Sequence, residues 1–468
     1  MANYRLVREI PIEDGYEVVV CGGGPAGTAA AICAARLGAK VLLVEATGCL
    51  GGMSTSGLVT SFGPMSDGKR MLVGGIMREI VEKMYVQNYF APQVVPDYWE
   101  KYSHCWTPFK PEGLKLLLDK LTVESGVDVL FFSSIIDVDA ENNRVNGVII
   151  NNTEGYRYIR AKTFIDATGN AVLADLCDAP RKQVGNGITR AMPSTLCSIY
   201  AGIDWENEMY GKERASLDSA RAEILEKIIP KAIADGHFTQ PEYFMPGMNK
   251  IGTTLGIMNG GHIFDLNALR CKSLTDGMMF GRKLAVEYTE FYRKYVPGCE
   301  NIEHVTTATL MGVRDSRRIN GEYELKVSDF MSRRQFPDQI GVYNRPLDVH
   351  PYDNSEEEYQ RFKNDFTQDG RLGTGECFGI PYGIIVPKGW GNLWVAGRCV
   401  SCDSKIHGSI RAMPAVAMMG QAAGTAAWQS IKTGQPANEL DTSKLVETLR
   451  HAGAYLPQRE LIRTITRS

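Results

Sequence analysis

The apolar positions near the start of the chain follow two periods, and their order predicts a known unit of structure. Residues 16–21 form a short apolar run that stops at the glycines of 22–24, which is typical of a buried strand. Residues 25–37 are rich in alanine and are followed by Gly38, which predicts a helix with a glycine cap. Residues 41–44 form a second apolar strand. The segment therefore predicts a βαβ unit and, through its crossover, a parallel sheet.

Further periodic segments extend this pattern. Apolar residues at helical spacing predict helices over 75–86 and 111–125. From 127 to 165 the chain changes to short strands divided by polar turns, which predicts a β-meander and a further strand. A late strand at 393–396 and an alanine-rich helix from about 414 to 430 then restore the first pattern.

This order predicts an α/β fold, with a Rossmann-type nucleotide-binding domain interrupted by an α+β substrate domain. The parallel sheet and its meander occupy residues 1–185, and the substrate domain occupies residues 186–380. Residues 381–468 supply the return strand and the C-terminal helices of the first domain. Within the substrate domain we expect helices near 214–235 and 276–294.

Composition excludes several classes of protein. The 468 residues carry a formal net charge of -3 and no polybasic block, so we expect neither nucleic acid nor membrane as a partner. No apolar run is long enough to cross a bilayer, and acidic residues occupy the start of the chain where a signal peptide would be apolar. We expect a cytoplasmic protein whose 11 dispersed cysteines are mostly reduced, and a homo-oligomer stays possible.

The strongest chemical motif lies between the first strand and the first helix. Gly22, Gly24 and Gly27 have the spacing G-x-G-x-x-G, which permits a tight turn, close approach of a pyrophosphate, and close packing of helix on strand. The N-terminus of the helix offers free N–H groups to the phosphates. Glu45 ends the second strand, where a carboxylate accepts hydrogen bonds from ribose hydroxyls and repels a 2′-phosphate. The motif predicts an adenine dinucleotide other than NADP.

Three further features favour FAD over NAD. Gly51 and Gly52 follow Glu45 closely and let the chain pass beside an extended cofactor. Gly169 closes the strand of Asp166-Ala167-Thr168, and Gly397 ends the strand of 393–396 late in the chain.

With these motifs, the chain resembles the FAD-dependent oxidoreductase family, which has the glutathione-reductase type of nucleotide fold and is related to fumarate-reductase-like flavoproteins. The resemblance extends over most of the chain. It is carried by VVVCGGGPAGTAAAICAARLGAKVLLVEATGCLGGMSTSGL at 18–58, FIDATGNAVLADLCDAP at 164–180, GVRDSRRINGEYEL at 312–325, NLWVAGRCVS at 392–401 and GSIRAMPAVAMMGQAAGTAA at 408–427.

The resemblance implies a set of cofactor contacts. The three glycines would hold the pyrophosphate, Glu45 the adenosine ribose, and a backbone group at Ile135 or Ile136 the adenine. An Asp that binds ribitol commonly follows the late glycine in this fold, but Arg398 stands here, so backbone groups or Asp403 are the alternatives. No histidine stands in an attachment pattern, so we expect noncovalent FAD.

The late helix is expected to serve the flavin. Pro414 fits its first turn, and the helix N-terminus can stabilise negative charge on reduced flavin. His407 and Arg411 stand just before this helix, so they are our first choices for catalysis. His407 would act as acid or base, and Arg411 would bind a substrate carboxylate or an oxyanion. Structural roles for both residues stay open.

Two weaker groups complete the candidates. Arg314, Arg317 and Arg318 would pair with acids at a domain junction or bind an anion, and on a helix the first and third would share a face. His262 beside a glycine-rich loop is a weaker candidate from the substrate domain.

The function predicted is hydride transfer between a small organic substrate and flavin N5, with an unknown electron donor or acceptor. One alternative is a dithiol oxidoreductase that uses Cys399 and Cys402, which form a C-x-x-C pair. A tRNA-modifying flavoprotein is the other alternative, and the acidic balance of the chain counts against it. No residues with the spacing of a metal site accompany the pair.

Overall fold

A five-stranded parallel sheet organises the molecule. The computed structural model describes residues 4–210, 224–243 and 248–457. The strand order β22-β10-β2-β3-β6 places the first and last parts of the chain in one sheet, since β10 pairs with both β2 and β22. The strands are β2 (Val18–Cys21), β3 (Val41–Val44), β6 (Val127–Leu130), β10 (Thr163–Asp166) and β22 (Leu393–Val395). The predicted α/β class and the interrupted sheet are confirmed.

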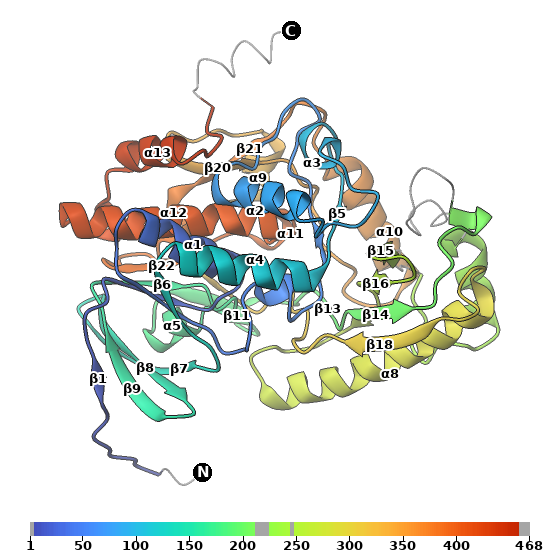
Figure 1. The fold of residues 1–468 in the computed structure, drawn as a ribbon, viewed down its shortest axis with the longest axis horizontal. Coiled ribbons are helices and arrows are strands. Elements are labelled where there is room, and N and C mark those ends of the chain that lie inside the picture. The colour runs from blue at the N-terminus through green and yellow to red at the C-terminus, as the bar shows by residue number, and fades with distance from the viewer. Residues whose placement is uncertain (1–3, 211–223, 244–247, 458–468) are drawn as a thin grey trace.

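Two alanine-rich helices pack together on one face of this sheet (Figure 1). They are α1 (Pro25–Arg36) and α12 (Met413–Thr433), both within a residue or three of their predicted bounds. A Cβ atom on Gly420 would lie 2.0 Å from the backbone oxygen of Ala26, and one on Gly424 would lie 2.2 Å from that of Ala30. The two backbones therefore touch, and the matching order of the contacts shows that the helices run parallel.

The remaining helices of this part are α2 (Gly75–Val86), α3 (Asp97–Glu100), α4 (Pro111–Glu124), α5 (Val172–Leu176), α11 (Ser404–Ile410) and α13 (Thr442–His451). Helices α2 and α4 pack on α1, α13 packs on α12, and α5 lies on the meander side. The predicted meander is a second sheet in the order β1-β9-β8-β7. Its strands are β1 (Ile12–Glu13), β7 (Ser134–Glu141), β8 (Arg144–Asn152) and β9 (Gly155–Arg160).

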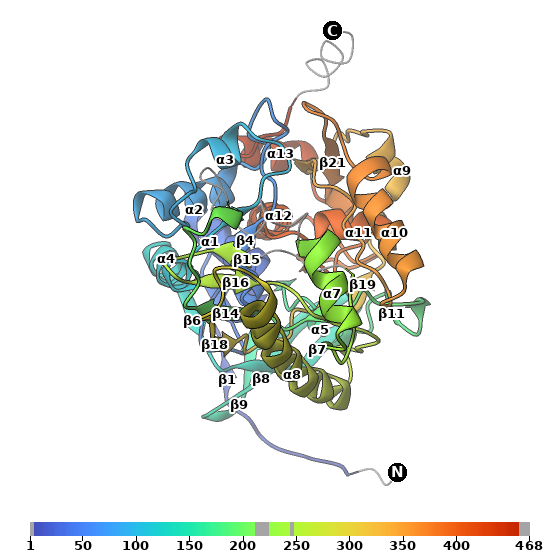
Figure 2. The same ribbon diagram turned by 90° about the vertical axis from the view of Figure 1, so that its right-hand side faces the viewer.

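A second hydrophobic core lies beside the first and is formed by residues from about 196 to 313. Its sheet has the order β15-β16-β14-β18, and α8 (Cys271–Tyr295) runs along it on the right of Figure 1. Turning the molecule brings α8 and α7 (Ile229–Ala234) toward the viewer (Figure 2). The strands are β14 (Ser198–Ala201), β15 (Met248–Lys250), β16 (Gly256–Met258) and β18 (Glu303–Thr307). The helix predicted near 276–294 is α8, and residues 214–223 of the other predicted helix lie outside the described residues.

The side chains from Leu325 to Tyr382 belong to the core of the nucleotide-binding part, although the sequence assigns most of them to the substrate domain. They include the antiparallel pair β20 (Gln339–Tyr343) and β21 (Phe378–Pro381), and β20 packs on α12. The boundary at residue 380 stays a prediction, and the packing favours an earlier return to the first domain. Helices α9 (Val327–Met331) and α10 (Glu356–Asn364) lie in this segment.

Shorter strands form small sheets of two or three strands in the described part of the chain. They are β4 (Ser61–Phe62), β5 (Thr107–Pro108), β11 (Arg181–Val184), β12 (Gly187–Ile188), β13 (Ser194–Thr195), β17 (His262–Ile263) and β19 (Arg317–Ile319). Among the described residues, every helix is too short or too polar to span a membrane.

Candidate active site

The three glycines of the first loop occupy three different environments. Gly22 has a φ of +99°, and a Cβ there would lie 2.6 Å from the backbone oxygen of Ala167. A Cβ on Gly27 would lie 1.7 Å from the backbone oxygen of Gly22, so helix and strand are in direct contact. At Gly24, by contrast, no described atom lies within 4 Å of the Cβ position. Gly24 therefore faces open space at the N-terminus of α1, where a pyrophosphate fits.

Glu45 stands directly beside this loop, at the carboxyl end of β3. Its Oε2 accepts a hydrogen bond from the Gly23 N–H at 2.6 Å, and its Oε1 accepts from the N–H and the hydroxyl of Thr47, both at 2.7 Å. These bonds fix a buried carboxylate at the edge of the phosphate loop. Its contact with a ribose stays a prediction.

The second glycine pair lies against the first loop. The N–H of Gly51 donates to the Gly23 oxygen at 2.8 Å. A Cβ on Gly52 would lie 3.0 Å from the Cα of Gly24. Two chain segments thus border the same space, which suits a cofactor that continues past the pyrophosphate.

The predicted adenine contact lies close to Glu45. Ser133 N–H donates to the Glu45 backbone oxygen at 3.0 Å, just before β7 begins. Ile136, in that strand, is 39% exposed. Phe132 lies over Gly48 and is also exposed, and sequence reasoning did not single it out. Both residues border the adenosine end, and the contact of Ile136 with adenine stays a prediction.

Arg398 crosses the ends of two neighbouring strands. Its Nη2 donates to Asn170 Oδ1 at 2.7 Å, and a Cβ on Gly169 would lie 2.9 Å from its Nη1. Its Nε is buried and has no hydrogen-bond partner among the described residues, and burial lowers the pKa of the guanidinium. Gly397 has a φ of +118° and adjoins Ala26 of α1. The turn therefore borders the phosphate loop, and the contacts of Gly169, Gly397 and Arg398 with FAD stay predictions.

The N-terminus of α12 extends beyond that of α1. Gly420 lies level with Ala26, so the seven residues before it project about 10 Å further at 1.5 Å per residue. Pro414 lies in the first turn of α12, as the sequence predicts. A cofactor held by its pyrophosphate at Gly24 can therefore present its far end to this second helix terminus.

Buried polar groups gather at this terminus. A Cβ placed on Gly63 would lie 3.3 Å from the Tyr343 hydroxyl, 3.6 Å from Cβ of Ala412 and 3.7 Å from Cδ of Arg345. Ala412 is the N-cap of α12. The Tyr343 hydroxyl and Arg345 Nε are buried and, in the part of the chain that the structure describes, have no hydrogen-bond partner. Unpaired buried polar groups are costly, so they point to a ligand site.

His407, predicted as an acid or base, is fully buried inside α11. Its Nε2 lies 2.7 Å from the backbone oxygen of Arg398, and since a carbonyl only accepts, the ring N–H donates. Burial, with Arg318 and Arg411 nearby, lowers the pKa of His407 to about 4, against an opposing effect of Asp315. A neutral ring bonded to the backbone favours a structural role, in which His407 holds the turn at Arg398. This environment favours the structural role that the sequence left open, and acid–base chemistry at His407 stays a prediction.

Arg411 belongs to a buried ionic cluster. Its Nη2 donates to the backbone oxygen and to Oδ2 of Asp348, at 3.0 and 2.9 Å. The same carboxylate accepts from Nη2 of Arg345, whose Nη1 donates to the Gly408 oxygen. Burial lowers the pKa of Arg411 to about 9, so the group stays protonated at neutral pH. Burial alone would raise the pKa of Asp348, but His350, Arg345 and Arg411 together hold it well below its usual value.

A row of histidines continues the cluster toward the substrate domain. His350 Nε2 lies 3.3 Å from Asp348 Oδ1, and His350 Nδ1 lies 2.8 Å from His262 Nε2. His262 Nδ1 in turn lies 3.0 Å from Glu242 Oε2. Burial, with Arg314 and His262 nearby, lowers the pKa of His350 well below its usual value despite Asp348. His262, a weaker candidate from the sequence, is therefore separated from Asp348 of the ionic cluster only by the side chain of His350.

The three arginines of the GVRDSRRI motif separate in space. They do not lie on a helix, since β19 begins at Arg317. Arg317 pairs with Asp175, and Arg318 lies 3.5 Å from Asp315. Arg314 donates to the backbone oxygen of Pro193 and to the Thr195 hydroxyl, at 2.6 and 2.8 Å. Ion pairing explains two of them, while Arg314 has no salt bridge among the described residues.

The C-x-x-C pair is buried. Burial raises the pKa of both Cys399 and Cys402 to about 12, so the reactive thiolate is scarce at neutral pH. Arg318 Nη1 donates to the Cys402 backbone oxygen and holds the segment in place. This environment disfavours thiol exchange. No set of three metal-ligating side chains forms among the residues described.

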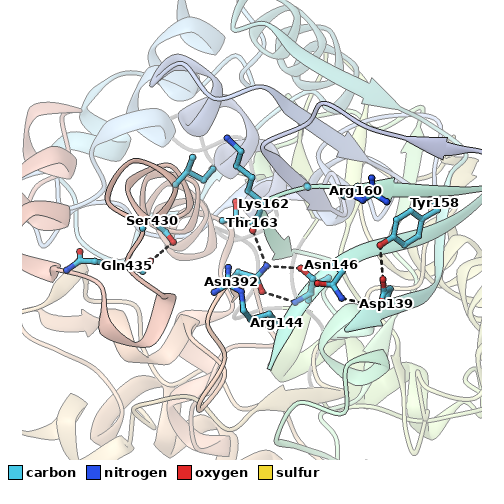
Figure 3. A pocket seen from close by; sticks show the side chains of 14 residues that line it. Asp139, Arg144, Asn146, Tyr158, Arg160, Lys162, Thr163, Asn392, Ser430 and Gln435 are labelled. Carbon is cyan, nitrogen blue, oxygen red and sulfur yellow. Dashed lines mark hydrogen bonds between the residues drawn. The ribbon is translucent and has the colours of Figure 1, made fainter. Parts of the chain in front are cut away.

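A cavity also lies at the opposite edge of the parallel sheet. It holds about 640 Å³ and is bordered by Lys162, Thr163 and Asn392, at the amino ends of β10 and β22 (Figure 3). Ligands of open parallel sheets bind at the carboxyl ends of the strands, which is the opposite edge. The polar groups of Asn392 are also satisfied by the backbone of Val145 and Lys162. We therefore assign no chemistry to this cavity.

Sequence reasoning missed half of the cluster. Tyr343, Arg345, Asp348 and His350 lie within eight residues of a segment that carries no familiar motif. The only signal was the concentration of Arg, Asp and His in an otherwise apolar stretch. Asp348 pairs locally with Arg345 and His350, but its third partner, Arg411, is 63 positions away, so the complete cluster was not visible in the sequence.

The chain belongs to the FAD-dependent oxidoreductase family. The family described as FAD dependent oxidoreductase matches residues 17–449, which includes the glycine loop, the ionic cluster and α12. FAD is therefore the cofactor, and the open space at Gly24 beside Glu45 fits its diphosphate and adenosine end.

Individual relatives are similar to parts of the chain, and one solved structure is similar in fold over most of it. Thiamine thiazole synthase of Aeropyrum pernix is 31% identical over 153 residues, which are 33% of this chain and 50% of that relative. Dihydrolipoyl dehydrogenase of Trypanosoma brucei brucei is 58% identical over 45 residues, which are 10% of this chain and 9% of that relative. The chain thus spans half or less of the length of these two relatives. The crystal structure of p-nitrophenol 4-monooxygenase from Pseudomonas putida aligns with 95% of this chain and 89% of its own, with 10% identity and a TM-score of 0.50, and this likeness concerns the fold alone.

Proposed function

We propose that this FAD-dependent oxidoreductase transfers a hydride between a small organic substrate and flavin N5 at the N-terminus of α12. The observation that carries the proposal is the group of buried, unpaired polar atoms of Tyr343, Arg345 and Arg411 beside Ala412. This group lies at the N-terminus of α12, whereas the phosphate loop lies at the N-terminus of the neighbouring helix α1.

Each element has a separate task in this proposal. The loop at Gly24 binds the diphosphate, and the N-terminus of α12 stabilises negative charge on the reduced ring. The bound flavin supplies the hydride acceptor or donor. Arg411 and Arg345 orient the substrate, and Trp106, whose ring centroid lies 5.0 Å from Arg345, limits the access of water. His407 acts as a positioning residue through the Arg398 carbonyl.

The test is anaerobic bleaching of the flavin. Protein purified with FAD is mixed with sugars, hydroxy acids, amines and enoates, and the oxidised flavin band is followed. If the enzyme oxidises its substrate, we expect one class of compound to bleach the flavin band. If it reduces its substrate, we expect one class to reoxidise the photoreduced protein. Arg411→Gln should slow that reaction at least tenfold while FAD stays bound. Protein that retains FAD but exchanges electrons with no organic compound in either direction would overturn the proposal.

A further inference from the structure

The buried cluster at the N-terminus of α12 contains more positive than negative charge. Arg314, Arg345 and Arg411 influence one another electrostatically, and Asp348 is the carboxylate they share. One carboxylate compensates one of three guanidinium groups. Glu242, beyond the histidine pair, compensates at most one more, so at least one positive charge stays in excess.

Neighbouring acids and histidines do not remove this excess. Asp315 is occupied by Arg318, which lies 3.5 Å away. His350 stays neutral because burial and Arg314 lower its pKa. An uncompensated buried charge is costly, so three arginines at this place favour the binding of an anion beside them.

The unused donors of the arginines are those an anion would meet. Arg345 Nε and Arg411 Nε are buried without hydrogen-bond partners among the described residues, although both Nη groups of Arg345 and Nη2 of Arg411 are engaged. Within the described part of the chain, the hydrogen bonds of Arg314 are made by Nη1, toward Pro193 and Thr195. Planar guanidinium groups bind carboxylates in two-point geometry, and the Trp106 ring beside Arg345 suits the organic part of a ligand.

We infer that Arg345, Arg411 and Arg314 bind the carboxylate of an organic acid, which is the substrate class of this enzyme. That the acid is a substrate rests on the proposed function, but its binding can be tested without turnover. Arg314 comes from the side of β13 and the other two from the nucleotide-binding part, so the acid would be held where the two parts of the chain meet.

The experiment compares acids with their amides. FAD-loaded protein is titrated with acetate, benzoate and succinate, with acetamide, benzamide and succinamide, and with inorganic phosphate. Binding is followed by calorimetry and by the shift of the flavin absorption band. We expect at least one acid to bind ten times or more tightly than its amide, because a charge-assisted hydrogen bond contributes about 1.5–3 kcal/mol.

Substitutions locate the site. Arg345→Gln and Arg411→Gln should each weaken binding of that acid at least tenfold, and Arg411→Lys should recover part of it. Arg317→Gln is the control, because Arg317 pairs with Asp175 away from the cluster, and it should bind the acid normally.

Three results would overturn the inference: equal binding of acids and amides, phosphate binding more tightly than every carboxylate, or Gln variants that keep FAD and bind the acid normally. If a Gln variant loses FAD, the comparison of acid and amide binding to the unchanged protein still tests whether the carboxylate is recognised. Acid binding without any flavin oxidation or reduction would preserve this inference and overturn the proposed function, so the two failures differ.

Discussion

At the residue scale, the three glycines of the first loop differ in the physical reason that each is glycine. Gly22 and Gly27 are required because backbone atoms already occupy the space of a side chain. Gly24 is different, since a Cβ there would meet nothing in the described chain. The described chain does not itself require glycine there, so the predicted approach of the FAD diphosphate is the reason we expect for it.

Alanine substitutions should separate these demands. Gly24→Ala should fold with unchanged stability, within about 1 kcal/mol, and lose FAD affinity at least tenfold, because its Cβ intrudes on the phosphate. Gly27→Ala should destabilise the fold by about 3 kcal/mol or more, since a backbone oxygen must move. Urea unfolding and FAD titration of the apoproteins measure both effects. Normal FAD affinity in Gly24→Ala would contradict the assignment.

His407 makes a second prediction, on acid stability. Its folded pKa of about 4 lies below the ordinary 6.5, so between these values the unfolded chain binds a proton that the folded chain excludes. Stability is therefore present above pH 6.5 and is lost as the pH falls toward 4. When the pH falls from about 7.5 to about 4.5, the free energy of unfolding should decrease in both proteins. The decrease should be smaller in His407→Gln than in the parent, by on the order of 2 to 3 kcal/mol. Urea unfolding at both pH values tests this, and an equal loss in both proteins would refute it.

At the scale of elements, the contact between α1 and α12 sets the geometry of the site. Small residues of α12 lie directly against the backbone of α1. This crossing fixes the offset that carries the N-terminus of α12 beyond the phosphate loop. The site thus depends on helix packing as much as on the residues that line it.

Gly424→Ala tests that dependence. Its Cβ would lie 2.2 Å from the Ala30 oxygen, so the helices must separate. We expect a loss of about 2 to 3 kcal/mol in stability and weaker FAD binding, although residue 424 lies several turns from the N-terminus of α12. Lys432→Ala, on the exposed surface of the same helix, should change stability by no more than about 0.5 kcal/mol. Equal effects of the two substitutions in thermal and urea unfolding would exclude a packing cause.

At the scale of the whole molecule, the cofactor site is built from both ends of the chain. The residues predicted to border it lie at 22–52 and 397–414, while residues from about 196 to 313, between them, form most of a second core. FAD should therefore join segments that are far apart in sequence, and it should stabilise the sheet that contains β2 and β22.

FAD binding should raise global stability by mass action. At a free FAD concentration about 100-fold above Kd, the free energy of unfolding should increase by about 2.7 kcal/mol. Calorimetry of the apoprotein at increasing FAD measures the shift in Tm, and NAD at the same concentrations is the control. A Tm that does not depend on FAD concentration would contradict the bridging arrangement.

The sequence by itself determined the βαβ unit, the phosphate loop, the late strand and helix, and through them the cofactor. These features are local, because a strand, a glycine turn and a helix terminus lie within about 30 consecutive residues. Only the tertiary structure decided the catalytic end. It placed His407 against a carbonyl and brought Asp348 to Arg411, since burial and long-range ion pairing depend on which segments meet. The excess of buried positive charge arises because Arg314, Arg345 and Arg411 come from three separate segments of the sequence.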